Sequence, residues 1–187
     1  MSLPQELRAN RLLLRRWTAS DRPMFAEINA DPRVMEFLPC PLSRPESDQL
    51  VERIEANFKE HGFGLWAVEI PEITPFAGFI GLNVPRFDAP FTPCIEIGWR
   101  LAAQVWGQGY ATEGARAALD FAFRSLNVDE VVAFTVPRNV RSRRVMDKLG
   151  MTYAAGEDFD HPLVAEGQPL RRHVLYRISG DCFRTSG

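Results

Sequence analysis

The chain has 187 residues, of which 45% are hydrophobic and 25% are charged, and this composition suits one folded domain with a sizeable core. The formal net charge is −2, so no excess of basic residues indicates a nucleic-acid partner. Three widely spaced cysteines, Cys40, Cys94 and Cys182, provide neither a disulfide framework nor the spacing of a metal site. We therefore expect no metal, no nucleic acid and a reducing, cytoplasmic location.

The N-terminal stretch MSLPQELRANRLLLRRW contains a three-leucine run that is broken by Arg15 and Arg16. It has the pattern of neither a signal peptide nor a membrane span, so we expect no association with a membrane. No repeat, low-complexity run or linker divides the chain. The sequence predicts one domain over residues 7–178, with flexible termini at 1–6 and 179–187.

The first elements expected are a strand over residues 11–17 and a helix over residues 22–30. Thr18 or Ser20 can cap this helix, because a side-chain oxygen can accept from the free amides of the first turn. An Asp-Pro pair at 31–32 ends or interrupts it.

A second helix begins at Ser43, which forms a capping box with Glu46, and Pro45 lies in the first turn, where proline is tolerated. Glycine at 62 or 64 ends this helix. Three residues spaced four apart predict its buried stripe: Leu50, Ile54 and Phe58.

Three strands are expected next, over residues 65–70, 76–83 and 95–101, and their short connections favour an antiparallel meander. A long amphipathic helix follows from about Gly109 to Ser125. The nearly continuous apolar run EVVAFTV at 130–136 indicates a central strand buried on both faces.

Asn139 can cap a further helix over residues 140–149, which Gly150 ends. Strand-like segments at 151–155 and 172–178 close the chain. This order of elements predicts a mixed α/β layer with helices on both faces.

The stretch that organises the chain lies between residues 94 and 123, where a strand passes through QVWGQG into a helix. Glycines let the backbone approach a ligand, and the free amides of a helix N-terminus favour an anion. A P-loop would need Lys after Gly109, where Tyr110 stands, and a dinucleotide-binding motif would need Gly or Ala in place of Thr112. A glycine-rich turn without a ligand is the plain alternative.

The pattern Gln-x-x-Gly-x-Gly at 104–109, after a strand and before a helix, resembles the pyrophosphate loop of the GNAT superfamily of acetyl-CoA-dependent N-acetyltransferases. About thirty residues later, Asn139 opens a helix that Leu149 and Gly150 close, which resembles the second signature of that family. Met151 stands where the family usually has Phe. The stretch WGQGYATE at 106–113 is similar to the branch of ribosomal-protein N-terminal acetyltransferases.

The resemblance covers most of the chain and implies the GNAT fold. That fold has a central mixed, mostly antiparallel sheet of six to seven strands, helices on both faces, and a fourth and a fifth strand that splay apart. The implied reaction moves the acetyl group of acetyl-CoA to a primary amine by direct attack in a ternary complex. The acceptor would be a protein N-terminus, an amino acid or a small amine, and a homodimer is a further family expectation.

The resemblance also assigns an acetyl-CoA site. Strand backbone would pair with the pantetheine, the glycine loop would wrap the pyrophosphate, and basic residues would meet the adenosine phosphate, for which Arg143 is one candidate. A solvent-facing helix surface is the alternative for the basic residues. The residues assigned to acetyl-CoA are Trp99, Arg100, Leu101, Gln104, Gly107, Gln108, Gly109, Tyr110, Ala111, Thr112, Asn139, Ser142, Arg144 and Lys148.

Many family members carry a Tyr that protonates the CoA thiolate at the place of Met146, and a thioether has no proton to donate. Ser142 lies one helical turn earlier, and by resemblance to the ribosomal-protein branch it is assigned the role of catalytic acid. The alternatives are a serine that bonds CoA or its own backbone, and a thiolate that leaves without an acid.

Glu96 is the candidate catalytic base, because a half-buried carboxylate beside the CoA cleft can take the amine's proton directly or through a water. An outward-facing strand glutamate is the alternative. Glu113 is a weaker candidate, since a carboxylate in the first turn simply suits the helix dipole. His161 and His173 flank a loop that can close over an acceptor.

The acceptor cleft is expected along the first two helices and the late loop, where aromatic residues, prolines and arginines gather. A second class of function stays open, a CoA-binding sensor with weak or no turnover, because Met146 replaces the usual Tyr. A dinucleotide-dependent oxidoreductase is disfavoured by the position of the loop past mid-chain. The residues expected along the cleft are Phe37, Leu38, Pro39, Trp66, Phe87, Phe91, Arg171 and Arg172.

Overall fold

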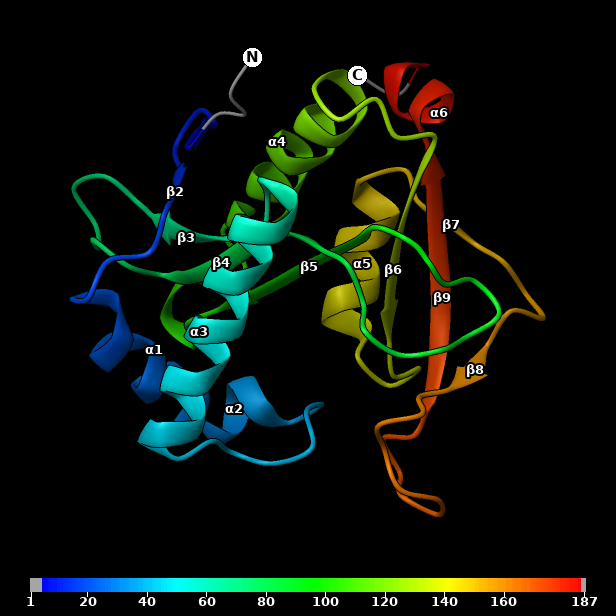
Figure 1. Cartoon of the computed structure of the whole chain (residues 1–187), viewed down its shortest axis with the longest axis horizontal. Helices are drawn as coiled ribbons and strands as arrows, with labels where there is room; N and C mark the ends of the chain where they lie inside the picture. Colours follow the sequence, from blue (N-terminus) through cyan, green and yellow to red (C-terminus); the bar gives the residue numbers. More distant parts are fainter. Residues whose placement is uncertain (1–4, 186–187) are drawn as a thin grey trace.

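One open sheet forms the centre of the molecule, and helices lie on both of its faces (Figure 1). The computed structural model describes residues 5–185. Eight strands follow one another across the sheet, and β8 (Phe159–Asp160) pairs in addition with β9. The spatial order is β1 (Leu7–Arg8), β2 (Leu13–Arg15), β3 (Leu65–Glu69), β4 (Gly78–Asn83), β5 (Glu96–Leu101), β6 (Glu130–Thr135), β9 (Arg172–Ser179) and β7 (Thr152–Tyr153).

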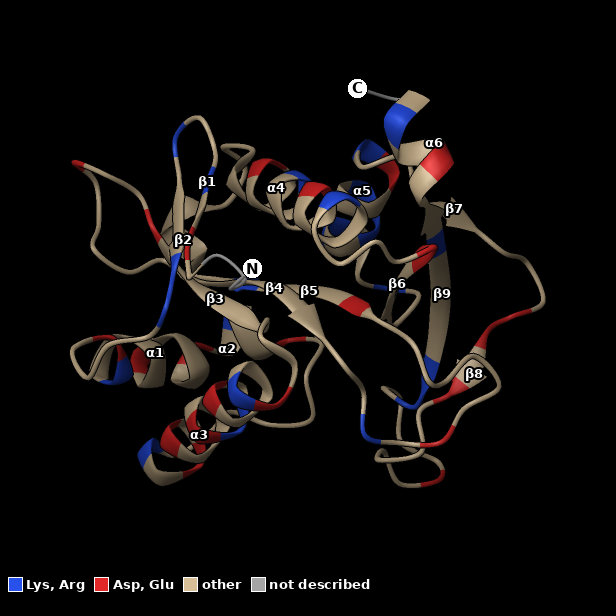
Figure 2. Ribbon diagram, turned by 45° about the horizontal axis from the view of Figure 1, so that its top comes forward, with Lys and Arg blue, Asp and Glu red and all other residues tan. Residues whose placement is uncertain are grey.

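Two groups of helices enclose this sheet, and Figure 2 shows α1, α2 and α3 on one side of it and α4 and α5 on the other. Blue and red segments alternate along α3 and α4 rather than gathering by sign, in keeping with the small net charge. The helices are α1 (Asp21–Ala30), α2 (Pro32–Met35), α3 (Arg44–His61), the short 3-10 turn η1 (Ala103–Val105), α4 (Tyr110–Arg124), α5 (Val140–Lys148) and α6 (Gly180–Thr185).

Strands β3, β4 and β5 form the predicted antiparallel meander. β5 and β6 are parallel, and their register holds only one residue pair, Glu96 with Val132. The amide of Val132 donates to the carbonyl of Ile95 at 2.9 Å, close to that pair. Every other strand pairing is antiparallel. The sheet therefore opens between β5 and β6, as the family resemblance implies for its fourth and fifth strands.

Helix α4 packs closely on the sheet because its inner face carries small residues. Ala115, Ala118 and Ala122 are fully buried, and Gly114 leaves so little room that a Cβ there would lie 2.5 Å from a methyl group of Ile80. Close approach of the helix fixes where its N-terminus lies relative to β5. The amphipathic helix predicted from about Gly109 to Ser125 is thus confirmed.

Local signals in the sequence also fix α3 and α5. The backbone amide of Ser43 donates to Glu46 at 2.7 Å in the predicted capping box, and Gly62 ends α3 with a φ of 77°. At the start of α5, the side chain of Asn139 accepts a hydrogen bond from the amide of Ser142 at 3.2 Å. Both predicted caps are confirmed.

Other expectations for the first helices need correction. Ser20 occupies the cap position of α1 but makes no capping hydrogen bond, and the Asp21 carboxylate instead accepts from the amide of Thr18 at 2.7 Å. After Pro32 the chain makes a further short helix, α2, which was not predicted. Leu50 is only half-buried, because the inward face of α3 runs through Ser47, Val51, Ile54 and Phe58.

The sheet has nine strands rather than six to seven. The strand expected at 11–17 is limited to Leu13–Arg15 and forms a hairpin with Leu7–Arg8, and β7 and β8 are likewise two-residue strands. Strands this short have no periodic sequence pattern of their own, and they form only because they pair with a neighbouring strand. Of the expected flexible termini, residues 1–4 and 186–187 lie outside the described residues, whereas Gly180–Thr185 form α6. Within residues 5–185, no helix is both long and apolar enough to cross a membrane.

We expect Gly78→Ala to lower the free energy of unfolding by about 2 kcal/mol or more, because left-handed backbone geometry strains an L-residue and the added methyl group must displace backbone. Gly78 has a φ of +123°, and its Cβ would lie 2.1 Å from the Arg100 carbonyl oxygen on β5. Urea unfolding measures the change. Gly167→Ala is the matched control, since Gly167 also has a positive φ, 78°, but open space around it. Equal losses in the two variants would contradict the argument from close strand contact.

Candidate active site

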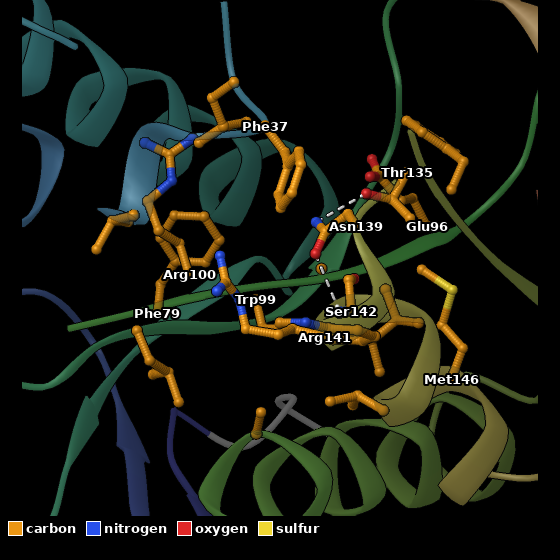
Figure 3. A pocket seen from close by; sticks show the side chains of 18 of the residues that line it. Phe37, Phe79, Glu96, Trp99, Arg100, Thr135, Asn139, Arg141, Ser142 and Met146 are labelled. Carbon is orange, nitrogen blue, oxygen red and sulfur yellow. Dashed lines mark hydrogen bonds between the residues drawn. The ribbon is translucent and has the colours of Figure 1, made fainter. Parts of the chain in front are cut away.

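A cavity of about 780 Å³ opens where β5 and β6 part. Its walls come from both sides of the sheet: β5 and the start of α4, the first turns of α5, the segment after α2, and the loop that precedes β9. Figure 3 shows this cavity with Glu96, Thr135 and Asn139 on one side and Arg100 with Phe79 on the other. The cavity therefore brings together residues that are far apart in the chain.

The glycine loop, residues 102–109, leads from β5 into α4 and presents backbone rather than side chains at the helix start. Gly107 and Gly109 have φ values of 76° and 87°, which non-glycine residues adopt at a cost. Gly109 occupies the cap position, and no side chain caps the first amides of α4. These amides and the positive end of the helix dipole suit a phosphate group.

Two contacts hold this loop from behind. The indole nitrogen of Trp106 donates to the carbonyl of Leu101 at 2.9 Å. Arg11 donates to the carbonyl of Gln108 at 3.1 Å and forms an ion pair with Glu113 at 2.7 Å. Glu113 thus already has a partner on the N-terminal hairpin and does not line the cavity, which agrees with its low rank as a candidate base.

Most of the residues assigned to acetyl-CoA lie in the cavity wall. The exceptions are Gln104 and Gln108, which are exposed on the outer side of the loop. Arg143 also lies outside the wall, because its guanidinium donates to the hydroxyl of Tyr176 at 3.1 Å. The wall contains Trp99, Arg100, Leu101, Gly107, Gly109, Tyr110, Ala111, Thr112, Asn139, Ser142, Arg144 and Lys148.

Glu96 stands at the point where β5 and β6 separate, and its side chain is half-buried in the cavity wall. The amide of Asn83 on the neighbouring strand β4 donates to its carboxylate at 3.1 Å. Burial raises the pKa of Glu96 to about 7, although the Asn83 hydrogen bond acts in the opposite direction. A carboxyl group with this pKa exchanges its proton near neutral pH, as a general base must. The alternative of an outward-facing glutamate is wrong.

Asn139 and Ser142 hold the end of β6 and the start of α5 in one arrangement. The Asn139 side chain donates to the hydroxyl of Thr135 at 3.0 Å and accepts from the amide of Ser142 (Figure 3). Ser142 lies in the cavity wall one turn before Met146, which also belongs to the wall but is almost completely buried. The hydroxyl of Ser142 is therefore available to a molecule in the cavity without any change in α5.

His161 and His173 also face the cavity, and their ring centres lie 5.0 Å apart. Burial lowers the pKa of His161 to about 4, helped by the neighbouring His173, and burial also lowers the pKa of His173. The Nδ1 atom of His161 accepts from the amide of Leu163 at 3.3 Å. Both rings are consequently neutral at pH 7.

The expected acceptor cleft is correct only in part. Phe37, Leu38 and Pro39, in the segment after α2, line the cavity, whereas Trp66 is fully buried in the core. Phe87 and Phe91 are not part of the cavity wall and pack in an aromatic cluster with the wall residue Phe134 and with Phe159. Arg171 and Arg172 form ion pairs with Asp160 at 3.4 and 3.3 Å and lie outside the wall.

Sequence reasoning missed several wall residues. Arg100 was expected to contribute only its backbone, yet its side chain lines the cavity beside Phe79. Asn83, the partner of Glu96, lies thirteen residues away on the next strand, so its role follows from strand register and from no motif. Within residues 5–185, no cluster of three or more His, Cys, Asp or Glu side chains is placed to hold a metal ion.

The comparison with known sequences decides the family. Residues 11–152 match the profile of the acetyltransferase (GNAT) domain. The chain belongs to the GNAT acetyltransferase family. Its enzyme class is therefore that of acetyl-CoA-dependent N-acetyltransferases, and the cavity, the uncapped amides of α4 and the basic residues of α5 fit acetyl-CoA as the acetyl donor.

Relatives from bacteria and fungi share the domain. The chain is 32% identical over 155 residues to the uncharacterized protein YkkB of Bacillus subtilis, covering 82% of this chain and 89% of the relative. It is 32% identical over 138 residues to an FsC-acetyl coenzyme A-N(2)-transacetylase of Aspergillus fumigatus, covering 71% of this chain and 58% of the relative.

Solved structures share the fold. The acetyltransferase of Agrobacterium tumefaciens superimposes with a TM-score of 0.74 at 30% identity, covering 95% of both chains. RimJ of Mycobacterium smegmatis in complex with CoA-disulfide superimposes with a TM-score of 0.73 at 18% identity, covering 94% of this chain and 86% of the other. The second likeness shows the fold alone.

We expect Glu96→Gln to stabilise the folded protein by roughly 1–3 kcal/mol at pH 8 and to leave its stability nearly unchanged at pH 4. The pKa of Glu96 is raised from about 4.5 to about 7, so the folded state disfavours the charged carboxylate. That penalty is absent below pH 4.5, grows between pH 4.5 and 7, and is complete above pH 7. Urea unfolding at the two pH values measures the difference. An unchanged stability at pH 8 would show that the folded state does not disfavour the carboxylate.

Proposed function

We propose that this enzyme transfers the acetyl group of acetyl-CoA to a primary amine by direct attack of the amine in a ternary complex. The observation that carries the proposal is one cavity that holds a carboxyl group of raised pKa, Glu96, together with the hydroxyl of Ser142 and the uncapped amides of α4. A direct transfer needs these three functions in one place: a base, a hydrogen-bond donor and an anion site.

The parting of β5 from β6 supports the binding of the pantetheine arm. Beyond Glu96, the edge of β5 that faces β6 has no partner strand among residues 5–185, while its other edge pairs with β4 through Leu101. Backbone groups on such an edge are left to pair with a ligand's amides. The pyrophosphate would then meet the amides at Gly107 to Thr112, and Arg144 and Lys148 lie where they can meet the adenosine phosphate.

Glu96 acts as the base in this proposal. The attacking amine must lose a proton, and at pH 7 about half of a carboxyl group with a pKa of about 7 is ionised and able to accept it. The α-amine of a peptide has an ordinary pKa of about 8, against about 10.4 for a lysine side chain. The pKa of an α-amine lies closer to that of Glu96 than the pKa of a lysine side chain does, and this favours an α-amine as the acceptor.

Ser142 supplies the donor that Met146 lacks. A thioether has no proton, whereas the serine hydroxyl one turn earlier can donate a hydrogen bond to the departing thiolate. A thiol with a pKa of about 8.5 also leaves with little assistance. We therefore infer a modest contribution from Ser142 and a larger one from Glu96.

The finer assignment is also a proposal. The stretch at 106–113 and the fold shared with RimJ support a protein N-terminus as acceptor and a place near the ribosomal-protein branch. A cytoplasmic location is part of the proposal, because the three cysteines are too widely spaced in the sequence to form a disulfide framework. A homodimer is part of the same proposal and is tested by sedimentation.

The acetyl donor is tested by calorimetric titration with acetyl-CoA, with NADH and ATP as control ligands. We expect micromolar binding of acetyl-CoA alone, because the loop lacks the features of the other two nucleotide sites. Binding that is followed by no acetyl transfer to any amine would favour the alternative of a CoA-binding sensor. If acetyl-CoA does not bind, the proposed reaction is wrong.

The roles of Glu96 and Ser142 are tested by pH–rate profiles of kcat/KM. The wild-type rate should rise with pH through about 7, because the ionised carboxylate is the active form. Glu96→Gln should lose this rise and about 10²–10⁴-fold in rate, and Ser142→Ala should lose roughly tenfold. Glu52→Gln, an exposed change on α3, is the control and should leave the profile unchanged. A Glu96→Gln enzyme that retains the rise would exclude Glu96 as the base.

A further inference from the structure

Arg100 is a cation inside the cavity without an anionic partner. Among residues 5–185, no carboxylate forms an ion pair with it, and burial lowers its pKa to about 10. Two other arginines of the cavity wall are neutralised. Arg33 pairs with Asp31, and Arg141 pairs with Glu36, each at 2.6 Å. Arg144, the remaining arginine of the wall, also lacks a carboxylate partner among residues 5–185, but it is exposed to water, whereas Arg100 is half-buried.

A neutral amide holds the Arg100 side chain in place. One of its terminal nitrogens donates to the Oδ1 atom of Asn29 at 2.6 Å. Asn29 is fully buried in α1, and its own amide nitrogen donates to the hydroxyl of Ser47 in α3 at 2.9 Å. The guanidinium also lies 5.5 Å from the ring centre of Phe79. Three elements thereby fix its orientation.

This arrangement leaves binding capacity unused. A guanidinium has five N–H donors, and the contact with Asn29 uses one. Removing a cation from water without an opposite charge is costly, and an amide or an aromatic ring offsets only part of that cost. An arginine fixed in this way is suited to bind a carboxylate with two parallel hydrogen bonds.

The register of β5 sets the distance between this cation and the proposed base. Glu96, Gly98 and Arg100 follow one another at alternate positions, so they share one face of the strand. Four residues of strand separate the α-carbons of Glu96 and Arg100 by roughly 13 Å. Gly98 places no side chain between them, and a Cβ there would lie at ordinary contact distance from Leu65, 3.9 Å, and from the Glu96 carboxylate, 4.0 Å. Figure 3 shows the two side chains on opposite sides of the cavity.

We propose that the acceptor carries a carboxylate separated from its amine by a spacer, and that Arg100 binds this carboxylate while the amine lies at Glu96. This inference rests on the proposed function, because it places the reacting amine beside Glu96. Because the two side chains lie on opposite sides of the cavity (Figure 3), the arrangement favours a spacer over a free α-amino acid, whose two charged groups are attached to one carbon. A short peptide fits, with the carboxylate supplied by its C-terminus or by an acidic side chain near its N-terminus.

Matched acceptors test the carboxylate and distinguish its two sources. Triglycine is compared with triglycinamide for the C-terminal source, and Gly-Gly-Asp-amide with Gly-Gly-Asn-amide for the side-chain source. At saturating acetyl-CoA, we expect the wild-type enzyme to show a KM at least tenfold lower for the carboxylate in at least one pair. Equal KM values within both pairs would overturn the proposal.

Two variants assign the preference to Arg100. Arg100→Gln removes the cation, and Asn29→Asp keeps it but places a carboxylate of the protein where Arg100 now meets an amide. The Ser47 hydroxyl can donate to the new carboxylate, so the shape of the site is retained. Both variants should lose the preference within the pair, which is a ratio of two KM values measured at saturating acetyl-CoA and therefore does not depend on the affinity for the donor. Arg33→Gln is the control and should keep the preference, because Arg33 is already paired and exposed.

The outcomes separate this inference from the proposed function. Acetyl transfer without a carboxylate preference, or a preference that persists in Arg100→Gln and Asn29→Asp, overturns only the inference. If no amine is acetylated, the proposed function fails, and calorimetry with the N-acetylated peptides still tests the anion site. If the wild-type protein then binds the N-acetylated carboxylate peptide and its amide counterpart equally well, the inference about Arg100 is overturned as well. Circular dichroism confirms that each variant is folded.

Discussion

The separation of β5 from β6 is the constraint on which the site depends. The two strands pair at Glu96 and Val132 and nowhere further along β5. Because a strand edge without a partner exposes backbone polar groups, something other than the sheet must satisfy them there. The same separation opens the cavity, places Glu96 at its inner end, and directs the glycine loop and α5 toward one space. The separation of these two strands thus determines where both the binding groups and the reacting groups lie.

Two charged groups share this cavity without neutralising each other. Glu96 and Arg100 are two of the costlier side chains of the molecule, since burial shifts both pKa values toward the neutral form. Among residues 5–185 neither forms an ion pair, and each instead contacts a neutral amide, Asn83 or Asn29. A protein selected for stability alone would pair or remove them. Their separation is what a two-point contact with an amine and a carboxylate requires.

Local signals in the sequence were enough to predict the glycine loop and the helix caps. The glycine loop, the capping box at Ser43 and the Asn139 cap each depend on residues within about four positions of one another, so single segments reveal them. The nine-stranded sheet was underestimated because two-residue strands such as β1 have no period. The contacts of Arg100 with Asn29 and of Arg11 with Glu113 join residues 71 and 102 positions apart. No short pattern contains such pairs, and they were not predicted.

The two sides of the cavity differ in how readily their residues can be substituted. The family match covers residues 11–152, whereas His161 and His173 in the wall come from the later segment. The proposed CoA side consists of backbone amides and of glycines with positive φ, which tolerate few substitutions. The proposed acceptor side is lined by side chains from α2, the segment after it, and the loop before β9, and Asn29 of α1 holds Arg100 there from 71 residues away. Substitutions there can change the acceptor without disturbing the CoA loop, so relatives that share the loop are free to differ in the amine they acetylate.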